Sequence, residues 1–141
     1  MNLTEIPFVK EFGIQKGADG NLRLPFNESV LNHLQTISAS AQFALAETAS
    51  GEMLQILFPD LVGKIIPVLR DSQIKFRKPA TKLIVAYPEV SDENIAKFTE
   101  LFFKKGRAII SVLVEVKDIE NTTTCVGTFS WFIQNIGAKK T

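Results

Sequence analysis

One short segment constrains the fold more than any other part of this chain. Nine of the fourteen residues from Ser38 to Gly51 are Ala, Ser or Gly. Apolar residues recur at helical spacing as far as Leu57, which predicts a helix over residues 38–57. The opposite face is hardly more polar, and Glu47 is the only charge before Glu52. A helix whose side chains are this small and uncharged is expected to be buried, with the backbone of neighbouring segments packed close to it.

The rest of the chain is mostly extended. A hairpin is expected over residues 12–26, because Asp19-Gly20 readily forms a tight turn. A second helix should begin after Ser91, a favourable N-cap, and stop at Gly106. Asn121 is expected in the left-handed conformation between the last two strands. The other strands are expected within residues 65–77, 81–87, 110–116 and 125–133. This order predicts an α+β fold in which an antiparallel sheet wraps one helix.

Size and charge narrow the possible functions. The chain has 141 residues and is 45% hydrophobic, which suits a single domain over residues 1–141. A formal net charge of +1 does not favour a nucleic-acid or membrane partner. The N-terminus lacks the pattern of a signal peptide, and no apolar run is long enough to span a membrane. We therefore expect a cytoplasmic protein.

The chain has one Cys and one His, and this limits its chemistry. A single Cys excludes an internal disulfide, and the pair cannot supply the ligands of a usual zinc site. No metal is therefore expected. A histidine mechanism would have to use His33, and a thiol mechanism would have to use Cys125. Cys125 shares a strand face with Phe129 and Trp131, which indicates a small packing residue.

Three stretches of sequence together resemble a known superfamily. They are NHLQTISASAQFALAETASG (residues 32–51), QIKFRKPAT (residues 73–81) and GRAIISVLVEVKD (residues 106–118). They are similar to hotdog-fold thioesterases, both the phenylacetate-pathway type and the uncharacterised bacterial relatives grouped as DUF4442. The resemblance implies a hotdog fold and hydrolysis of an acyl thioester, usually a coenzyme A ester, without a cofactor. It also implies a substrate site between two subunits, in a homodimer or a dimer of dimers.

The same resemblance assigns site residues. Glu47 matches the helix acid that activates water or attacks the thioester carbonyl. Asn32 matches the loop residue that positions the carbonyl or the water. The backbone N–H groups of Ala39 and Ser40 match the donors that hold the oxyanion, with His33 and Ser38 nearby.

Physical chemistry supports these assignments independently. A carboxylate on a buried, uncharged helix loses hydration, and this raises its pKa toward a value useful for a general base. Free N–H groups at a helix start form an anion site that a low dielectric strengthens. A base and an oxyanion site are sufficient for a reactive thioester.

The sequence departs from the family pattern at two places. Phenylacetate-type members have His-Gly-Gly at the helix start, where this chain has Ser38-Ala39-Ser40. Relatives of the Asn-His-x-Gly-Thr type have Gly where this chain has Gln35. The Gln35 change matters if the backbone needs a positive φ at that position. At the helix start, the Cβ atoms of Ala39 and Ser40 narrow the space through which a substrate can approach.

Other interpretations remain open. A hotdog protein could bind an acyl group or acyl carrier without catalysis. His33 and Glu47 are fourteen positions apart, as in hotdog dehydratases, although the Pro-Gly-rich stretch of those enzymes is missing. Asn32 could act only by hydrogen-bonding the backbone of its own turn. Ser38 and Ser40 could cap the central helix. Glu47 could be solvated or could pair with a residue across a dimer interface. The basic residues Lys75, Arg77, Lys78 and Lys82 could contact coenzyme A phosphates or form an ordinary solvated strand edge.

Overall fold

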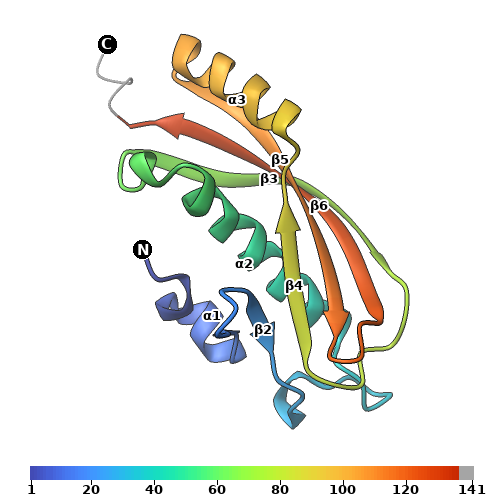
Figure 1. The fold of residues 1–141 in the computed structure, drawn as a ribbon. Helices are drawn as coiled ribbons and strands as arrows, with labels where there is room; N and C mark the ends of the chain where they lie inside the picture. The colour runs from blue at the N-terminus through green and yellow to red at the C-terminus, as the bar shows by residue number, and fades with distance from the viewer. Residues whose placement is uncertain (137–141) are drawn as a thin grey trace.

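The central helix forms where the sequence predicts it. The computed structural model describes residues 1–136, and helix α2 spans Ala39–Leu57 with Ser38 as its N-cap. It lies along the concave side of the curved sheet (Figure 1). Its alanines, from Ala41 to Ala49, are buried, which allows close approach of the surrounding backbone.

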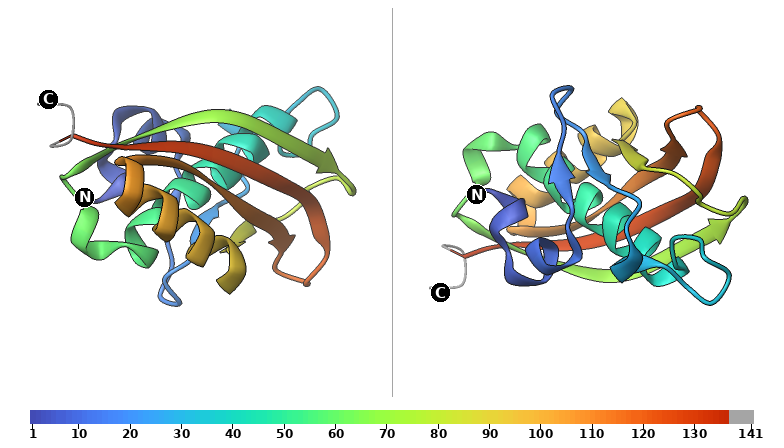
Figure 2. Two further views of the ribbon diagram at one scale, coloured as in Figure 1. Left: turned by 90° about the horizontal axis from the view of Figure 1, so that it is seen from above. Right: turned by 90° about the horizontal axis from the view of Figure 1, so that it is seen from below.

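Six strands form one antiparallel sheet around this helix. Their order across the sheet is β1-β2-β4-β5-β6-β3, so β3 forms one edge, opposite β1 (Figure 2). The strands span Gln15–Lys16 (β1), Leu22–Leu24 (β2), Ile65–Phe76 (β3), Ile84–Glu89 (β4), Arg107–Asp118 (β5) and Thr123–Asn135 (β6). The predicted α+β arrangement is confirmed.

The core lies between α2 and the long strands β5 and β6. Alternate residues of β5, from Ile110 to Val116, are buried, as the alternation predicts. On β6, the buried Phe129 ring meets the Phe43 ring edge-on at 5.5 Å. Cys125 is fully buried in this core, and burial raises the pKa of its thiol to about 12. Its packing role is therefore confirmed, since such a thiol stays protonated at neutral pH.

The second helix, α3, spans Asp92–Lys105 and has ordinary local chemistry. The Ser91 hydroxyl caps it by accepting the Asn94 N–H at 3.1 Å, and Gly106 ends it with φ of 78°. Its buried residues are Phe98 and Phe102, and α3 packs against β5. The Phe98 ring lies 5.1 Å from the ring of Phe58, the C-cap of α2.

Both predicted turns are confirmed. Asn121 has φ of 70° between β5 and β6, and Gly20 has φ of 88° in the β1–β2 hairpin. A short N-terminal helix, α1 (Pro7–Phe12), and three single 3₁₀ turns were not predicted from the sequence. These turns are η1 (Leu3–Glu5), η2 (Glu28–Val30) and η3 (Pro59–Leu61). No helix within residues 1–136 has the length and apolar character needed to cross a membrane.

The edge strand β3 is unusually open. It runs for twelve residues and pairs with β6 along one side only. Its exposed apolar residues include Ile66, Val68 and Phe76. Long, unpaired and partly apolar edges are ready to pair with another strand.

Candidate functional site

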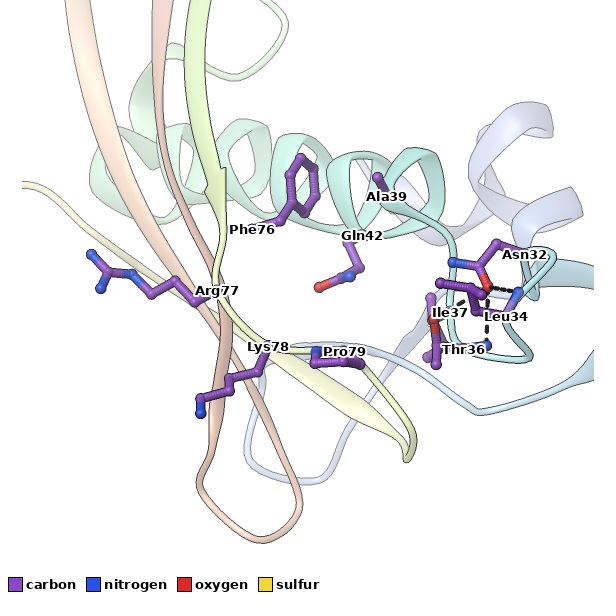
Figure 3. A pocket seen from close by; sticks show the side chains of 10 residues that line it. All are labelled: Asn32, Leu34, Thr36, Ile37, Ala39, Gln42, Phe76, Arg77, Lys78 and Pro79. Carbon is purple, nitrogen blue, oxygen red and sulfur yellow. Dashed lines mark hydrogen bonds between the residues drawn. The ribbon is translucent and has the colours of Figure 1, made fainter.

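A pocket of about 440 Å³ lies where the start of α2 meets the end of β3. It combines residues that are far apart in the sequence, from the loop before α2, from α2 itself and from the segment that follows β3 (Figure 3). The lining residues are Asn32, Leu34, Thr36, Ile37, Ala39, Gln42, Phe76, Arg77, Lys78 and Pro79. Four of the predicted site residues (Asn32, Ala39, Arg77 and Lys78) therefore share one pocket.

Asn32 holds the loop in shape with one end of its side chain. Its Oδ1 accepts hydrogen bonds from the Leu34 N–H at 2.9 Å, the Thr36 N–H at 3.1 Å and the Thr36 hydroxyl at 3.2 Å. Asn32 therefore does stabilise its own turn, which was one of the two roles predicted for it. These bonds occupy the oxygen and leave Nδ2 as the free donor end, which points toward Ala39 and Gln42 (Figure 3).

The loop keeps a backbone conformation that usually belongs to glycine. Gln35 has φ of 63°, and its N–H donates to the Asn32 carbonyl at 3.1 Å. A side chain in this left-handed region costs about 1–2 kcal/mol. Gln35 therefore holds, with strain, a backbone conformation that glycine adopts freely.

The start of α2 presents two free backbone donors beside the pocket. The Ser38 hydroxyl accepts the Ala41 N–H at 3.1 Å, and the Ser38 carbonyl accepts the Gln42 N–H at 3.0 Å. Within residues 1–136, no protein acceptor bonds the N–H groups of Ala39 and Ser40. Two unpaired N–H groups at the positive end of a nineteen-residue helix favour an anionic oxygen. Ser38 thus caps the helix and holds these donors in place.

Glu47 lies further along α2, on another face. It follows Gln42 by five positions, which turns it by about 140° around the helix axis. Ser40 and Gly51 share its face; Ser40 is exposed, and Glu47 and Gly51 are half-buried. Glu47 makes no side-chain hydrogen bond or ion pair within the described residues. Partial burial raises the pKa of its carboxyl above the ordinary 4.5.

Gln42 is a pocket residue that the sequence analysis missed. It is only 4% exposed, and its Oε1 has no hydrogen-bond partner among the described residues. The signal available in the sequence was an uncharged polar residue between Ala41 and Phe43, inside a run of small and apolar residues.

The predicted basic residues separate into two groups. Arg77 and Lys78 lie at the rim of the pocket, and their side chains extend outward (Figure 3). Their backbone N–H groups donate to the Thr124 carbonyl, which anchors the rim to β6. Lys82 lies outside the pocket lining, and its Nζ is 3.7 Å from a carboxylate oxygen of Glu120. Lys75 faces a separate hollow between β3 and β6.

The remaining candidates lie apart from the pocket. The side chains of His33 and Ser40 are exposed and do not line it. Within residues 1–136, no three His, Cys, Asp or Glu side chains gather in a group that could hold a metal ion.

A second cavity, of about 330 Å³, lies near the C-terminal half of α2. Gly51, one turn after Glu47, forms part of its wall together with Leu54, Phe58 and Trp131. A Cβ at position 51 would lie 3.3 Å from the Trp131 ring, which is tighter than most real contacts. The Trp131 indole N–H donates to the Ser50 hydroxyl at 2.9 Å and fixes the ring. This cavity is largely apolar.

Comparison with known proteins places this geometry in a family. A family model described as a domain of unknown function, DUF4442, matches residues 9–133. Among solved structures, a probable thioesterase from Pseudomonas aeruginosa, PA5026, is similar with a TM-score of 0.79 and 21% identity, over 94% of this chain and 91% of that one. No curated protein matches the chain.

Two further structures have the same fold. The BH2602 protein of Bacillus halodurans, solved with CoA, matches with a TM-score of 0.69 and 25% identity, over 89% of this chain and 74% of that one. The thioesterase HI1161 of Haemophilus influenzae matches with a TM-score of 0.71 and 17% identity, over 99% and 90% of the two chains. The chain therefore belongs to the DUF4442 family and has a hotdog fold.

Proposed function

We propose that this protein hydrolyses acyl-coenzyme A esters at a site shared by two subunits. The pocket of one protomer would hold the thioester, and Glu47 of the partner subunit would activate the water. The observation that carries this proposal is the pair of free N–H groups at the start of α2, beside the free donor end of Asn32 in a pocket.

The features of α2 support a shared site. Glu47 lies on a different face from the pocket of its own protomer, and the described part of the chain buries its side chain only in part. The β3 edge is open as well, with Phe76 both on the edge and in the pocket lining. Pairing of two β3 edges in a symmetric dimer would cover both features at once.

The proposed reaction needs only groups of this chain and water. The Glu47 carboxylate takes a proton from water as the water oxygen attacks the thioester carbonyl carbon. The carbonyl oxygen becomes an oxyanion, and the N–H groups of Ala39 and Ser40 with Asn32 Nδ2 donate to it. The carbon–sulfur bond then breaks, and the thiolate leaves and receives the proton. The products are a carboxylic acid and a thiol.

The raised pKa of Glu47 suits this role, because a stronger base accepts a proton from water more readily. Only the ionised form acts as the base. The rate should therefore fall as the pH drops through the pKa of Glu47, above 4.5.

The two ends of the substrate would lie in regions of different chemistry. Arg77 and Lys78 at the rim would contact the phosphates of coenzyme A, and the CoA complex of the Bacillus halodurans protein supports a ligand of this type. The apolar cavity that begins at Gly51, on the Glu47 face, would receive the acyl chain.

A panel of acyl-coenzyme A esters, with a colorimetric reagent for the released thiol, tests this proposal. We expect turnover by the wild type and a loss of about 100-fold or more in kcat for Glu47→Gln, the range of a general base. Glu52→Gln is the matched control, since Glu52 is the other acid of α2 and pairs with Lys16 at 2.6 Å. Tight acyl-coenzyme A binding without turnover by the wild type would contradict hydrolysis and favour a non-catalytic binding protein.

A further inference from the structure

Gln42 is one of two described residues with a buried side-chain atom that has no hydrogen-bond partner; the other is Arg23, through Nε. Its side chain is 4% exposed, and Oε1 is buried without a hydrogen-bond partner in the described chain. The residue lines the pocket between Phe76 and the loop that carries Asn32, and Figure 3 shows its carboxamide directed toward the rim segment of Lys78 and Pro79.

An unpaired buried acceptor has a cost that an apolar residue would avoid. Leaving such a group without a partner costs about 1–3 kcal/mol. Met would fill a similar volume at this position with at least equal helix propensity. Buried polar groups in native proteins nearly always have a partner, so an exception in a pocket wall indicates that a ligand supplies it.

The pocket also restricts what that ligand can be. Oε1 accepts hydrogen bonds, so the ligand must offer an N–H or O–H group. The walls beside Gln42 are apolar, from Phe76, Ile37, Leu34 and Pro79, and the cationic side chains stand only at the rim. The segment that passes Gln42 should therefore be uncharged and slender, carry a donor, and lead to an anionic group outside.

The pantetheine arm has this chemistry, because two secondary amides separate its thiol from its phosphate. We propose that the Gln42 carboxamide binds an amide of the pantetheine arm, with Oε1 accepting the amide N–H, and so makes the pocket selective for thioesters of pantetheine. This inference rests on the proposed function and adds the residue that recognises the carrier half of the substrate. Coenzyme A and acyl carrier proteins share this arm.

The direct test compares two thioesters with the same acyl group, one of coenzyme A and one of a simple alkanethiol without an amide. Gln42→Met should lower kcat/KM for the coenzyme A ester by about 5- to 100-fold, the range of a lost buried hydrogen bond. It should lower kcat/KM for the alkanethiol ester by a much smaller factor, because that ester has no amide to lose. Gln134→Met, a half-buried glutamine on β6 away from the pocket, is the matched control and should change neither value.

Two further measurements do not depend on turnover. Gln42→Met should raise the Tm of the ligand-free protein, because it removes the unpaired acceptor, and should weaken binding of free pantetheine in calorimetry. Comparing coenzyme A with pantetheinylated carrier protein as ligands identifies the natural source of the arm, and Gln42→Met should weaken both.

Several results would overturn the inference. They are equal losses on both thioesters, unchanged kinetics on both, or a variant that becomes monomeric, which would assign Gln42 to the subunit interface. The proposed function fails separately. If the wild type hydrolyses nothing but binds pantetheine in a Gln42-dependent manner, hydrolysis is wrong and the recognition of the arm stands.

Discussion

The two long helices of this protein follow opposite rules. In α3, Ser91 caps the start, Asp92 and Glu93 lie in the first turn, and Lys104 and Lys105 lie in the last. These charges complement the helix dipole. Gly106 ends the helix, and its N–H donates to the Phe102 carbonyl. The buried residues Phe98 and Phe102 face the core. The caps, the end charges and the buried stripe of α3 all stabilise the fold.

In α2, several of these stabilising features are missing. It has no acidic residue in its first turn and no basic residue in its last. Two N–H groups at its start, the Gln42 oxygen and the Glu47 carboxylate have no partner among the described residues. The difference indicates that α3 is built for stability, whereas α2 leaves groups unsatisfied where a ligand or a second subunit completes them.

The largest expected effect is on stability and belongs to α3. Phe102→Ala should reduce the free energy of unfolding by about 3–5 kcal/mol, because it leaves a cavity at a side chain that is 2% exposed. Denaturant unfolding measures this loss. The activity per folded molecule should stay near that of the wild type, and a selective loss of kcat would contradict the division between the helices.

A smaller and more discriminating pair of changes removes the two N-caps. Ser38→Ala and Ser91→Ala should each cost about 1 kcal/mol of stability, since each hydroxyl accepts one backbone N–H at 3.1 Å. Thermal unfolding should therefore not distinguish them. Only Ser38→Ala should lower kcat on a thioester, because it loosens the turn that holds the two free donors. Equal kcat values for the two variants would argue against a role for the start of α2.

The strained loop before α2 offers a stabilising change. Gln35→Gly should raise the free energy of unfolding by up to about 1 kcal/mol, because glycine adopts φ of 63° without strain. The gain is partly offset by the greater freedom of glycine in the unfolded chain. Chemical denaturation at equilibrium checks the sign. Destabilisation would mean that the Gln35 side chain makes a contribution that outweighs the strain.

The smallest effect concerns the pH dependence of stability. The pKa of Glu47 is raised by burial, so the folded protein binds this proton more tightly than the unfolded chain. The stability that Glu47 contributes is present below pH 4.5 and is lost as the pH rises through its folded pKa. Glu47→Gln should therefore unfold at a slightly higher denaturant concentration than the wild type at neutral pH. The difference should shrink as the solution is acidified, and a difference that grows would be inconsistent with a raised pKa.

Much of this architecture could be predicted from local sequence. The small-residue run gave the limits of α2, and Ser91 marked a helix start through its capping hydroxyl. Gly106 and Asn121 marked a helix end and a turn through a positive φ that few other residues favour. The helix α1 escaped prediction because six residues offer too little periodicity, and its C-cap Gly13 was not recognised as a stop signal.

The pocket could be predicted only in part. Asn32 and Ala39 followed from resemblance to a family, but their meeting with Phe76 and Lys78 depends on how the sheet closes around α2, which no local pattern encodes. Gln42 was overlooked because the sequence alone does not show whether a single polar residue in an apolar run is exposed to solvent or buried in a pocket wall. Glu47 stood out in the sequence, but the face it occupies, away from the pocket of its own protomer, emerged only from the structure.

The central claim, that the pocket of one subunit works with Glu47 of the partner subunit, is tested most directly by mixed dimers. Asn32→Asp keeps the acceptor for the loop but removes the Nδ2 donor, and Glu47→Gln removes the base. Each variant alone should be nearly inactive. Co-expressed, they should regain about a quarter of wild-type activity, because half of the dimers carry one intact shared site. A mixture of Glu47→Gln with the double variant should stay inactive. Failure of the first mixture to recover, with heterodimers present, would contradict the account.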